Sequence, residues 1–404
     1  MFFRSCAILL ILVLVACSSD APGLGQVEPL DTPAGEDSRW PALSSDGDGV
    51  ILSWLVPDAS GTWSLRMARL DDSGWGDVRT VATEGARPFF VNWADFPAVW
   101  AVSTEMLAAH WLVRGDEGGY DYGVRVAFSS DGGERWSEPW TPHEDGTPTE
   151  HGFVSMVPVS DGEVGMVWLD GRKSARTEDG GEGLAEMTLR FRTGSLGGPP
   201  GPETLLDDLI CDCCKTDAAV TGRGPIVVYR NRTHAEVRDI YVARLTGEGW
   251  TPGHAVHDDG WVFPACPVNG PAIDADGESV VVAWFTGAND EPKVKVAFSS
   301  DAGELFGPPT EVDLGNPLGR VDVLLLEDGS ALVSWIEGRG QDAEILARRV
   351  QPGGSMDRPE GISPTSAGRD SGFPRMLQDA HGRILFAWTA SGNPTSVRVA
   401  RTGG

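Results

Sequence analysis

Three cysteines lie within four positions of the chain, Cys211, Cys213 and Cys214, and a fourth follows at Cys266. An exported protein forms disulfides by default. We favour Cys211–Cys214 with Cys213–Cys266, because a C-x-x-C bond is less strained than a bond between adjacent residues. Two alternatives remain open. The thiols can instead bind copper or zinc with a histidine such as His257, or form a redox-active pair.

A second group of side chains combines carboxylates and histidines, which can move protons, with arginines, which can hold an anionic group. Two tryptophans accompany them. The members are Trp93, Asp95, His143, Glu150, His151, Asp170, Arg172, Arg230, Arg238 and Trp261. They lie in short segments between apolar runs, so their chemistry depends on whether the fold brings them together.

The apolar runs recur at regular spacing. Seven of them end near an aromatic residue, at intervals of 51 to 61 residues: Trp54, Trp111, Trp168, Tyr229, Trp284, Trp335 and Trp388. This period predicts an all-β propeller of seven four-stranded blades, with six as the alternative. In each blade the aromatic strand is the second. The chain ends after a third strand, so we expect residues 27–30 to complete the last blade, with Pro29 on its outer edge.

The propeller predicts where the reactive residues gather. The loops that join a fourth strand to the next first strand emerge on the same face as the loops between second and third strands. Nearly all of the reactive residues lie in these two kinds of loop, in blades two to five. We therefore expect one polar face rich in His, Cys and Arg, although polar loop residues can also be merely solvated.

One stretch, VRVAFSSDGGERW at 124–136, returns as VKVAFSSDAGELF at 294–306. Each copy reads as a strand that enters a tight turn, in which Asp accepts turn N–H groups and Gly takes a positive φ. The spelling S-x-D-x-G-x-x-W resembles the Asp-box of the sialidase and BNR-repeat superfamily. The matching residues are Ser129, Asp131, Gly133 and Trp136, then Ser299, Asp301, Gly303 and Phe306. In that family the box is a structural turn between the third and fourth strands of a blade.

The resemblance implies a protein that binds or hydrolyses a glycan, and, if it is an enzyme, an exo-sialidase-like glycoside hydrolase. Sialidase chemistry needs arginines for the substrate carboxylate, a Tyr–Glu nucleophile pair and a carboxylic acid. The expected acid/base residues are Asp95, Glu150 and Asp170, assisted by His151 or His143. Arg172, Arg230 and Arg238 would hold an anionic group, and Trp93 and Trp261 would stack on a sugar ring. The nucleophile stays unassigned, the early Arg-Ile-Pro signature of the family is absent, and sialidases proper have six blades.

Two other functions remain open. One is a thiol- or metal-dependent envelope protein, with copper or zinc, centred on Cys211–Cys214 and Cys266. The other is a non-catalytic scaffold for a protein partner. The net charge of −27 argues against nucleic acid and against anionic membrane surfaces as partners.

The first residues have one positive charge and a short apolar run, which is typical of a secretory signal at 1–16. The run ends in Leu14-Val15-Ala16-Cys17, which resembles the lipobox of bacterial lipoproteins and implies a diacylated Cys17. Ser18 follows in place of the Asp that favours inner-membrane retention, so the resemblance implies the outer membrane. We expect a tether at 17–37 and a single propeller domain at 38–404, attached to the cell envelope by the lipid alone.

Overall fold

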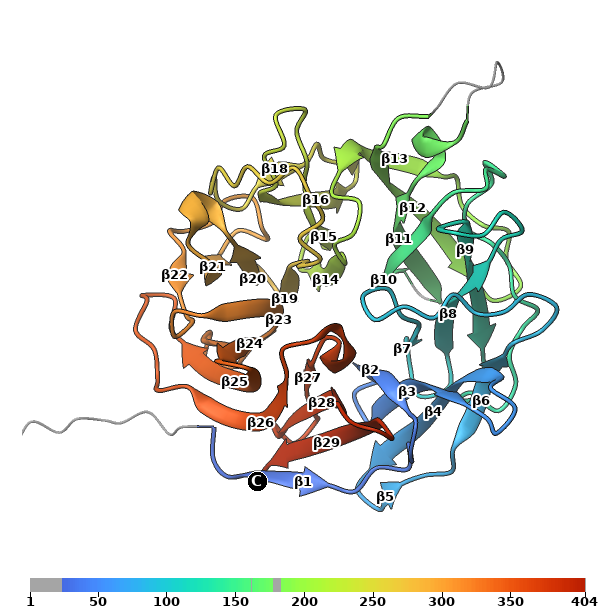
Figure 1. The fold of residues 1–404 in the computed structure, drawn as a ribbon, viewed down its shortest axis with the longest axis horizontal. Coiled ribbons are helices and arrows are strands. Elements are labelled where there is room, and N and C mark those ends of the chain that lie inside the picture. Colours follow the sequence, from blue (N-terminus) through green and yellow to red (C-terminus); the bar gives the residue numbers. More distant parts are fainter. Residues whose placement is uncertain (1–23, 161, 177–182, 404) are drawn as a thin grey trace, which may run out of the picture.

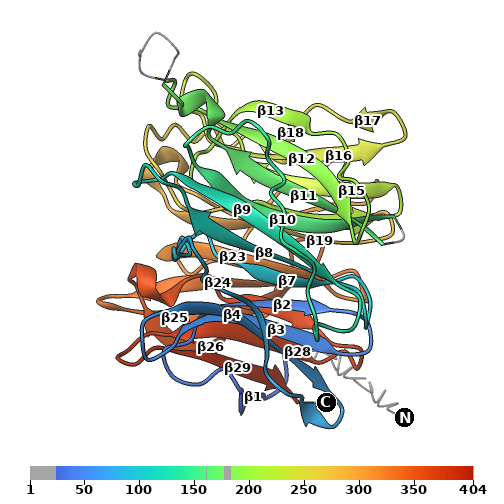
Figure 2. The same cartoon turned by 90° about the vertical axis from the view of Figure 1, so that its right-hand side faces the viewer.

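The computed structural model describes residues 24–160, 162–176 and 183–403. Seven antiparallel sheets surround a central axis, and the first strand of each sheet lies nearest that axis (Figure 1). Turned on its side, the ring shows strands that cross from one face to the other (Figure 2). The predicted all-β propeller of seven blades is confirmed.

The first four blades follow the chain from the N-terminal side. Blade one has β2 (Arg39–Ser45), β3 (Val50–Pro57) and β4 (Trp63–Asp71), with β5 (Gly74–Trp75) and β6 (Arg79–Thr83) both paired to β4. Blade two has β7 (Ala98–Ala101), β8 (Leu107–Arg114) and β9 (Tyr122–Ser129). Blade three has β10 (His151–Ser160), β11 (Glu163–Asp170), β12 (Met187–Ser195) and β13 (Thr204–Ile210). Blade four has β14 (Asp217–Thr221), β15 (Gly224–Arg230) and β16 (Ile240–Thr246), with β17 (Gly249–Trp250) and β18 (His254–Ala255) paired to β16.

The remaining blades complete the circle. Blade five has β19 (Ala272–Asp276), β20 (Ser279–Thr286), β21 (Lys293–Ser299) and β22 (Thr310–Glu311). Blade six has β23 (Pro317–Leu325), β24 (Ala331–Arg339), β25 (Asp342–Val350) and β26 (Glu360–Ser366). Blade seven has β27 (Arg375–Gln378), β28 (Ile384–Ala390), β29 (Ser396–Thr402) and β1 (Val27–Leu30). In the described residues, the loops contain three single 3-10 turns: η1 (Arg172–Ser174), η2 (Ala288–Asp290) and η3 (Arg369–Ser371).

The seven aromatic residues of the repeat all lie in second strands, as expected. Trp168, Trp284 and Trp335 are completely buried. A second strand has a neighbouring strand on each side and a neighbouring blade on each face. Large apolar side chains on this strand therefore fill the space between blades, and this burial drives the folding of the ring.

The N-terminal strand closes the ring. Strand β1 pairs with β29, and Pro29 lies opposite Ala400 on the outer edge. The packed part of the chain begins earlier than expected, because Ala34 is buried and the Asp37 backbone N–H donates to the Thr395 carbonyl at 2.8 Å. Residues 27–37 thus belong to the last blade rather than to a flexible tether. The signal sequence and Cys17 lie outside the described residues.

Blade two differs from the others because three strands make up its sheet in the described part of the chain. The loop that follows β9 covers the open edge instead. Val126 and Trp140 exchange backbone hydrogen bonds, and the Val124 N–H donates to His143 Nε2 at 3.2 Å. A histidine side chain therefore replaces a backbone acceptor, which draws residues 140–150 against the blade.

The two Asp-box turns have the same hydrogen bonds. Ser129 Oγ donates to Asp131 at 2.9 Å and accepts the Gly133 N–H at 2.9 Å. Ser299 Oγ donates to Asp301 at 2.7 Å and accepts the Gly303 N–H at 3.0 Å. Gly133 and Gly303 have φ of 89° and 78°, as the sequence predicts. Both turns are structural.

Among the described residues, no helix is long and apolar enough to cross a membrane.

Candidate functional site

The structure brings two of the expected carboxylates together through a tyrosine. The Tyr122 hydroxyl lies 2.7 Å from Asp95 Oδ2 and 2.8 Å from Glu150 Oε1. Asp95 precedes β7, Tyr122 opens β9 and Glu150 precedes β10, so all three lie where loops of blades two and three emerge on one face. Asp95 and Tyr122 are buried, whereas Glu150 is partly exposed. We call these three residues the carboxyl–tyrosine chain.

The two hydrogen bonds of the carboxyl–tyrosine chain need two hydrogen atoms, so one of its two carboxyl groups must be protonated. A phenol has one hydrogen and can donate to one of its two carboxyl neighbours. The other carboxyl must therefore be protonated and donate to the tyrosine oxygen. Burial raises the pKa of Asp95 to about 7 and that of Glu150 to about 8. The Phe153 N–H donates to Asp95 at 2.9 Å and favours its ionised form, so Glu150 holds the proton at neutral pH.

Tyr122 also lines a surface cleft of about 400 Å³. Three arginines line this cleft as well: Arg87, Arg114 and Arg125. We call it the arginine cleft. His143 and His151 line it from the loop side, and carboxylates of Asp116, Glu117 and Asp121 are also present.

The arginines of the cleft are not equally available to a ligand. Arg87 pairs with Asp116, while Arg114 lies over the Phe90 ring at 5.0 Å. The side chain of Arg125 makes no hydrogen bond or ion pair within the described part of the chain. Burial and the charge of Arg87 lower its pKa. Arg125 is therefore the arginine of this cleft whose charge is left without an ion-pair partner in the described part of the chain, although Asp116, Glu117 and Asp121 line the same cleft.

The two histidines stack at 3.9 Å between ring centres. His151 is buried, and its Nε2 lies 3.1 Å from Asp145. Burial opposes protonation of His151, but the hydrogen bond that its ring donates to Asp145 outweighs this effect and raises the pKa of His151. Burial and the neighbouring His151 lower the pKa of His143 to about 3, so His143 is neutral. The pair positions the loop against blade two, and neither ring contacts the carboxyl–tyrosine chain by a hydrogen bond.

Asp170 does not join the other two carboxylates. It is completely buried and accepts hydrogen bonds from Trp168 Nε1 at 3.0 Å and from Arg172 Nε at 2.6 Å. Burial would raise its pKa, but the bonds from Arg172 lower it. An ionised, fully bonded carboxylate has no proton to give. The structure thus places Asp170 apart from the other two carboxylates as an ionised group, and its expected acid/base role stays a prediction.

The three expected arginines are all occupied. Arg172 pairs with Asp170 and Glu203. Arg230 is buried and donates to the carbonyls of Asn269, Arg238 and Phe285. Arg238 pairs with Asp212 and Glu236 and approaches the Cys211 sulfur. Each guanidinium thus bonds to groups of blades three to five, and the expected role of these arginines toward a substrate stays a prediction.

The two tryptophans also pack against other side chains, Trp261 buried and Trp93 partly exposed. Trp261 is buried, stacked on Phe263 and covered by the Arg230 guanidinium at 4.9 Å. Trp93 stacks on Phe373 at 5.9 Å, and Arg320 lies over its ring at 5.0 Å. Neither ring has a free face for a sugar.

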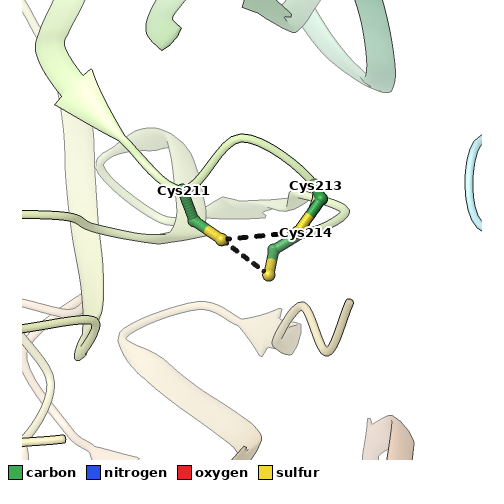
Figure 3. A group of neighbouring side chains, drawn as sticks. All are labelled: Cys211, Cys213 and Cys214. Carbon is green, nitrogen blue, oxygen red and sulfur yellow. Dashed lines mark hydrogen bonds between the residues drawn. The ribbon is translucent and has the colours of Figure 1, made fainter. Parts of the chain in front are cut away.

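The cysteines match the expected pairing in part. Cys213 and Cys266 form a disulfide, with Cα atoms 6.0 Å apart. Cys211 and Cys214 are unbonded, although their sulfurs are 2.9 Å apart (Figure 3). The disulfide removes two of the four sulfurs from any metal set. His257, the expected histidine ligand, pairs with Asp259 at 2.9 Å instead.

Sequence reasoning missed Tyr122, Arg114 and Arg125. Each is a strand residue, and strand residues are assigned to packing by their alternation. A signal was nevertheless present, because Arg114 ends a second strand and Tyr122 opens the next third strand. Both therefore lie on the face to which the expected carboxylates were assigned.

No family model matches the sequence, and no curated protein matches it. Solved structures do share the fold. The polysaccharide lyase Uly1 is similar with a TM-score of 0.51 and 11% identity, over 92% of this chain and 90% of that chain. The NanB sialidase of Streptococcus pneumoniae (K499G mutant) gives 0.47 and 9%, over 94% and 92%. An α-L-arabinanase of Penicillium chrysogenum gives 0.47 and 12%, over 94% and 97%. At such identities the match to the lyase shows a shared propeller fold alone.

Proposed function

We propose that this protein binds an acidic glycan in the arginine cleft and hydrolyses it with the carboxyl–tyrosine chain. The observation that carries the proposal is the shared proton of Asp95, Tyr122 and Glu150. A carboxylic acid that stays protonated near neutral pH is what glycoside hydrolysis needs in order to protonate the leaving oxygen. Arg125, which lines the cleft together with Tyr122, would supply the charge that an acidic sugar requires.

The roles follow from exposure. Glu150 is the partly exposed member and would donate the proton to the glycosidic oxygen. Tyr122, which itself lines the arginine cleft, would return a proton to Glu150, because its hydroxyl contacts both carboxyl groups. Asp95 is buried and would exchange that proton with Tyr122.

The test is a panel of neutral, uronic-acid, sialic-acid and sulfated glycans, assayed for binding and for release of reducing ends. We expect binding of at least one acidic glycan, and turnover that falls by roughly 10²-fold or more in Glu150→Gln. Glu144→Gln is the matched control, since Glu144 lies in the same loop and is 68% exposed. Full turnover by Glu150→Gln, or no glycan bound, would overturn the proposal.

We also propose that the protein is anchored in the outer membrane by a lipid on Cys17, as the lipobox resemblance implies. The propeller would then meet glycans at the cell envelope. The test is metabolic labelling with an alkyne palmitate in a bacterial host, followed by membrane fractionation. We expect label in the wild type and none in Cys17→Ala. Equal labelling of the two proteins, or a wild type without lipid mass, would contradict this placement.

A further inference from the structure

Four sulfur atoms gather where the loops of blades three, four and five meet. Cys211 Sγ lies 2.9 Å from Cys214 Sγ and 4.0 Å from Cys213 Sγ, and dashed lines in Figure 3 mark both contacts. Cys213 continues through its disulfide to Cys266. Cys211 and Cys214 are buried, whereas Cys266 is exposed. A buried dithiol therefore contacts a disulfide whose far end reaches the solvent.

The two thiols of the dithiol differ in their surroundings. Arg238 Nη1 lies 3.3 Å from Cys211 Sγ, and the Arg230 charge is also close. Burial opposes ionisation of Cys211, but the hydrogen bond with Cys214 and these two charges outweigh it and lower its pKa to about 7. Burial raises the pKa of Cys214. The thiolate is the nucleophile in disulfide exchange, so Cys211 can attack while Cys214 keeps its proton.

We propose that Cys211, Cys214, Cys213 and Cys266 form an internal thiol–disulfide relay, which passes two electrons from the buried dithiol to the exposed disulfide. This activity is separate from the glycan chemistry proposed above. The carboxyl–tyrosine chain does not take part in it.

The relay proceeds in two exchanges. The Cys211 thiolate attacks Cys213 Sγ, forms a Cys211–Cys213 bond and releases Cys266 as a thiolate. Cys214 then loses its proton to the released thiolate, attacks Cys211 Sγ as a thiolate, forms Cys211–Cys214 and releases Cys213. The protons of Cys211 and Cys214 pass to Cys213 and Cys266. One disulfide and two thiols are present before and after, so no outside oxidant is consumed.

The exposed end defines the substrate class, which is an external disulfide. The freed Cys266 thiolate attacks that disulfide and releases one thiol. Cys213 then attacks Cys266 Sγ, releases the second thiol and restores Cys213–Cys266. The external disulfide gains two electrons and two protons, and the dithiol is left as Cys211–Cys214. A purely structural bond would have no need of an arginine-stabilised thiolate beside it.

The experiment follows Cys266 in the native full-length chain. Protein is incubated with iodoacetamide over a pH series, and the alkylated peptides are identified by mass. We expect Cys266 to be alkylated progressively and Cys211–Cys214 to appear as a disulfide-linked peptide. In Cys211→Ser this labelling should stop. In Arg238→Ala its pH midpoint should rise from about 7, with labelling at pH 7 slower by roughly tenfold for each unit of rise.

Arg232→Ala is the matched control, because Arg232 shares the partner Glu236 with Arg238 and makes no contact with sulfur. Its labelling should equal that of the wild type. The relay would be overturned if Cys266 of the wild type were not alkylated, or if Cys211→Ser were labelled as fast as the wild type. Stoichiometric copper or zinc bound to the thiols would also overturn it. A wild type that holds both disulfides and does not open with an added dithiol would overturn it too.

Discussion

The backbone of Gly152 lies directly against the Asp95 carboxylate. A β carbon at position 152 would overlap Asp95 Oδ2 and lie 2.7 Å from Cε2 of Tyr122. Strand β10 can pass beside the carboxyl–tyrosine chain because this position has no side chain. The geometry of the chain therefore depends on a residue that performs no chemistry.

Gly152→Ala should displace Asp95 or Tyr122 and leave the blades intact. We expect glycan turnover to fall by roughly 10²-fold, since a shift of about 1 Å at a reacting group costs that much. Gly247→Ala is the control, because its β carbon would meet nothing within 4 Å. Circular dichroism and turnover are measured together. Normal turnover in Gly152→Ala would show that the chain is not the reacting group.

The protonation of Glu150 predicts how stability changes with pH. The folded pKa values of Glu150 and Asp95, about 8 and about 7, lie above the usual 4.5 and 3.8. At a pH between the usual pKa and the folded pKa of each carboxyl group, the folded state binds a proton that the unfolded state has released. The free energy of unfolding should therefore fall as pH rises from about 5 to 9.

Buried histidines complicate the absolute curve. Burial lowers the pKa of His110 to about 4, and His110 and His143 contribute in the opposite sense below pH 6.5. The informative quantity is the difference between wild type and Glu150→Gln in urea unfolding. We expect the wild type to lose at least about 1 kcal/mol more than the variant across this range. Parallel curves would contradict a proton on Glu150.

Arg125→Ala tests the arginine cleft. Arg125 has no carboxylate partner in the described part of the chain, so its removal should weaken an acidic glycan by about tenfold and leave neutral glycans unchanged. Stability should not fall, because the charge of Arg87 already disfavours this guanidinium. Arg135→Ala is the control, since Arg135 pairs with Asp131 on the Asp-box turn. Calorimetric titration with matched acidic and neutral oligosaccharides checks the result.

The fold could be predicted from the sequence because it is a repeat. The second strands of the blades have equivalent surroundings, so each needs a large apolar side chain that is buried between blades. Examples are Trp54, Trp168, Trp284 and Trp335. The closing strand could be predicted because the last repeat ends after its third strand, so a fourth strand had to come from the N-terminal residues 27–30. Pro29 then indicated an outer edge, and the structure has it there.

The site could be predicted only in part, because pairing between loops has no local signal. Asp170 and Arg172 are two residues apart and form an ion pair, which the sequence pattern did not indicate. Arg230 is satisfied by three carbonyls, of which two lie far along the sequence, that of Asn269 in a loop and that of Phe285 in β20. Conversely, Tyr122 meets Glu150 through a 28-residue separation that depends on the path of residues 130–150. The conformation of the loops decides which polar side chains remain unpaired. The periodic pattern of the strands gives no information about that conformation.

Substitution of the two Asp-box glycines, Gly133 and Gly303, can distinguish the cost of backbone strain from the cost of side-chain overlap. Both have positive φ, so replacing either by Ala should cost about 1–2 kcal/mol from conformation alone. A β carbon at Gly303 would also overlap Ile226 Cδ1, whereas one at Gly133 would lie 2.9 Å from the sulfur of Met67. Ile226 is branched and completely buried, and Met67 is unbranched and can change rotamer.

We therefore expect Gly303→Ala to lower the free energy of unfolding by about 1 kcal/mol more than Gly133→Ala. Urea unfolding at one pH measures both, with Gly307→Ala as the control, because its β carbon would meet only the Phe298 carbonyl oxygen at 3.6 Å. Adding Ile226→Val to Gly303→Ala should recover part of the loss, since it removes the overlapping methyl group. Equal losses at the two glycines, with no recovery, would mean that the left-handed backbone alone fixes these turns and that the packing of Ile226 contributes nothing.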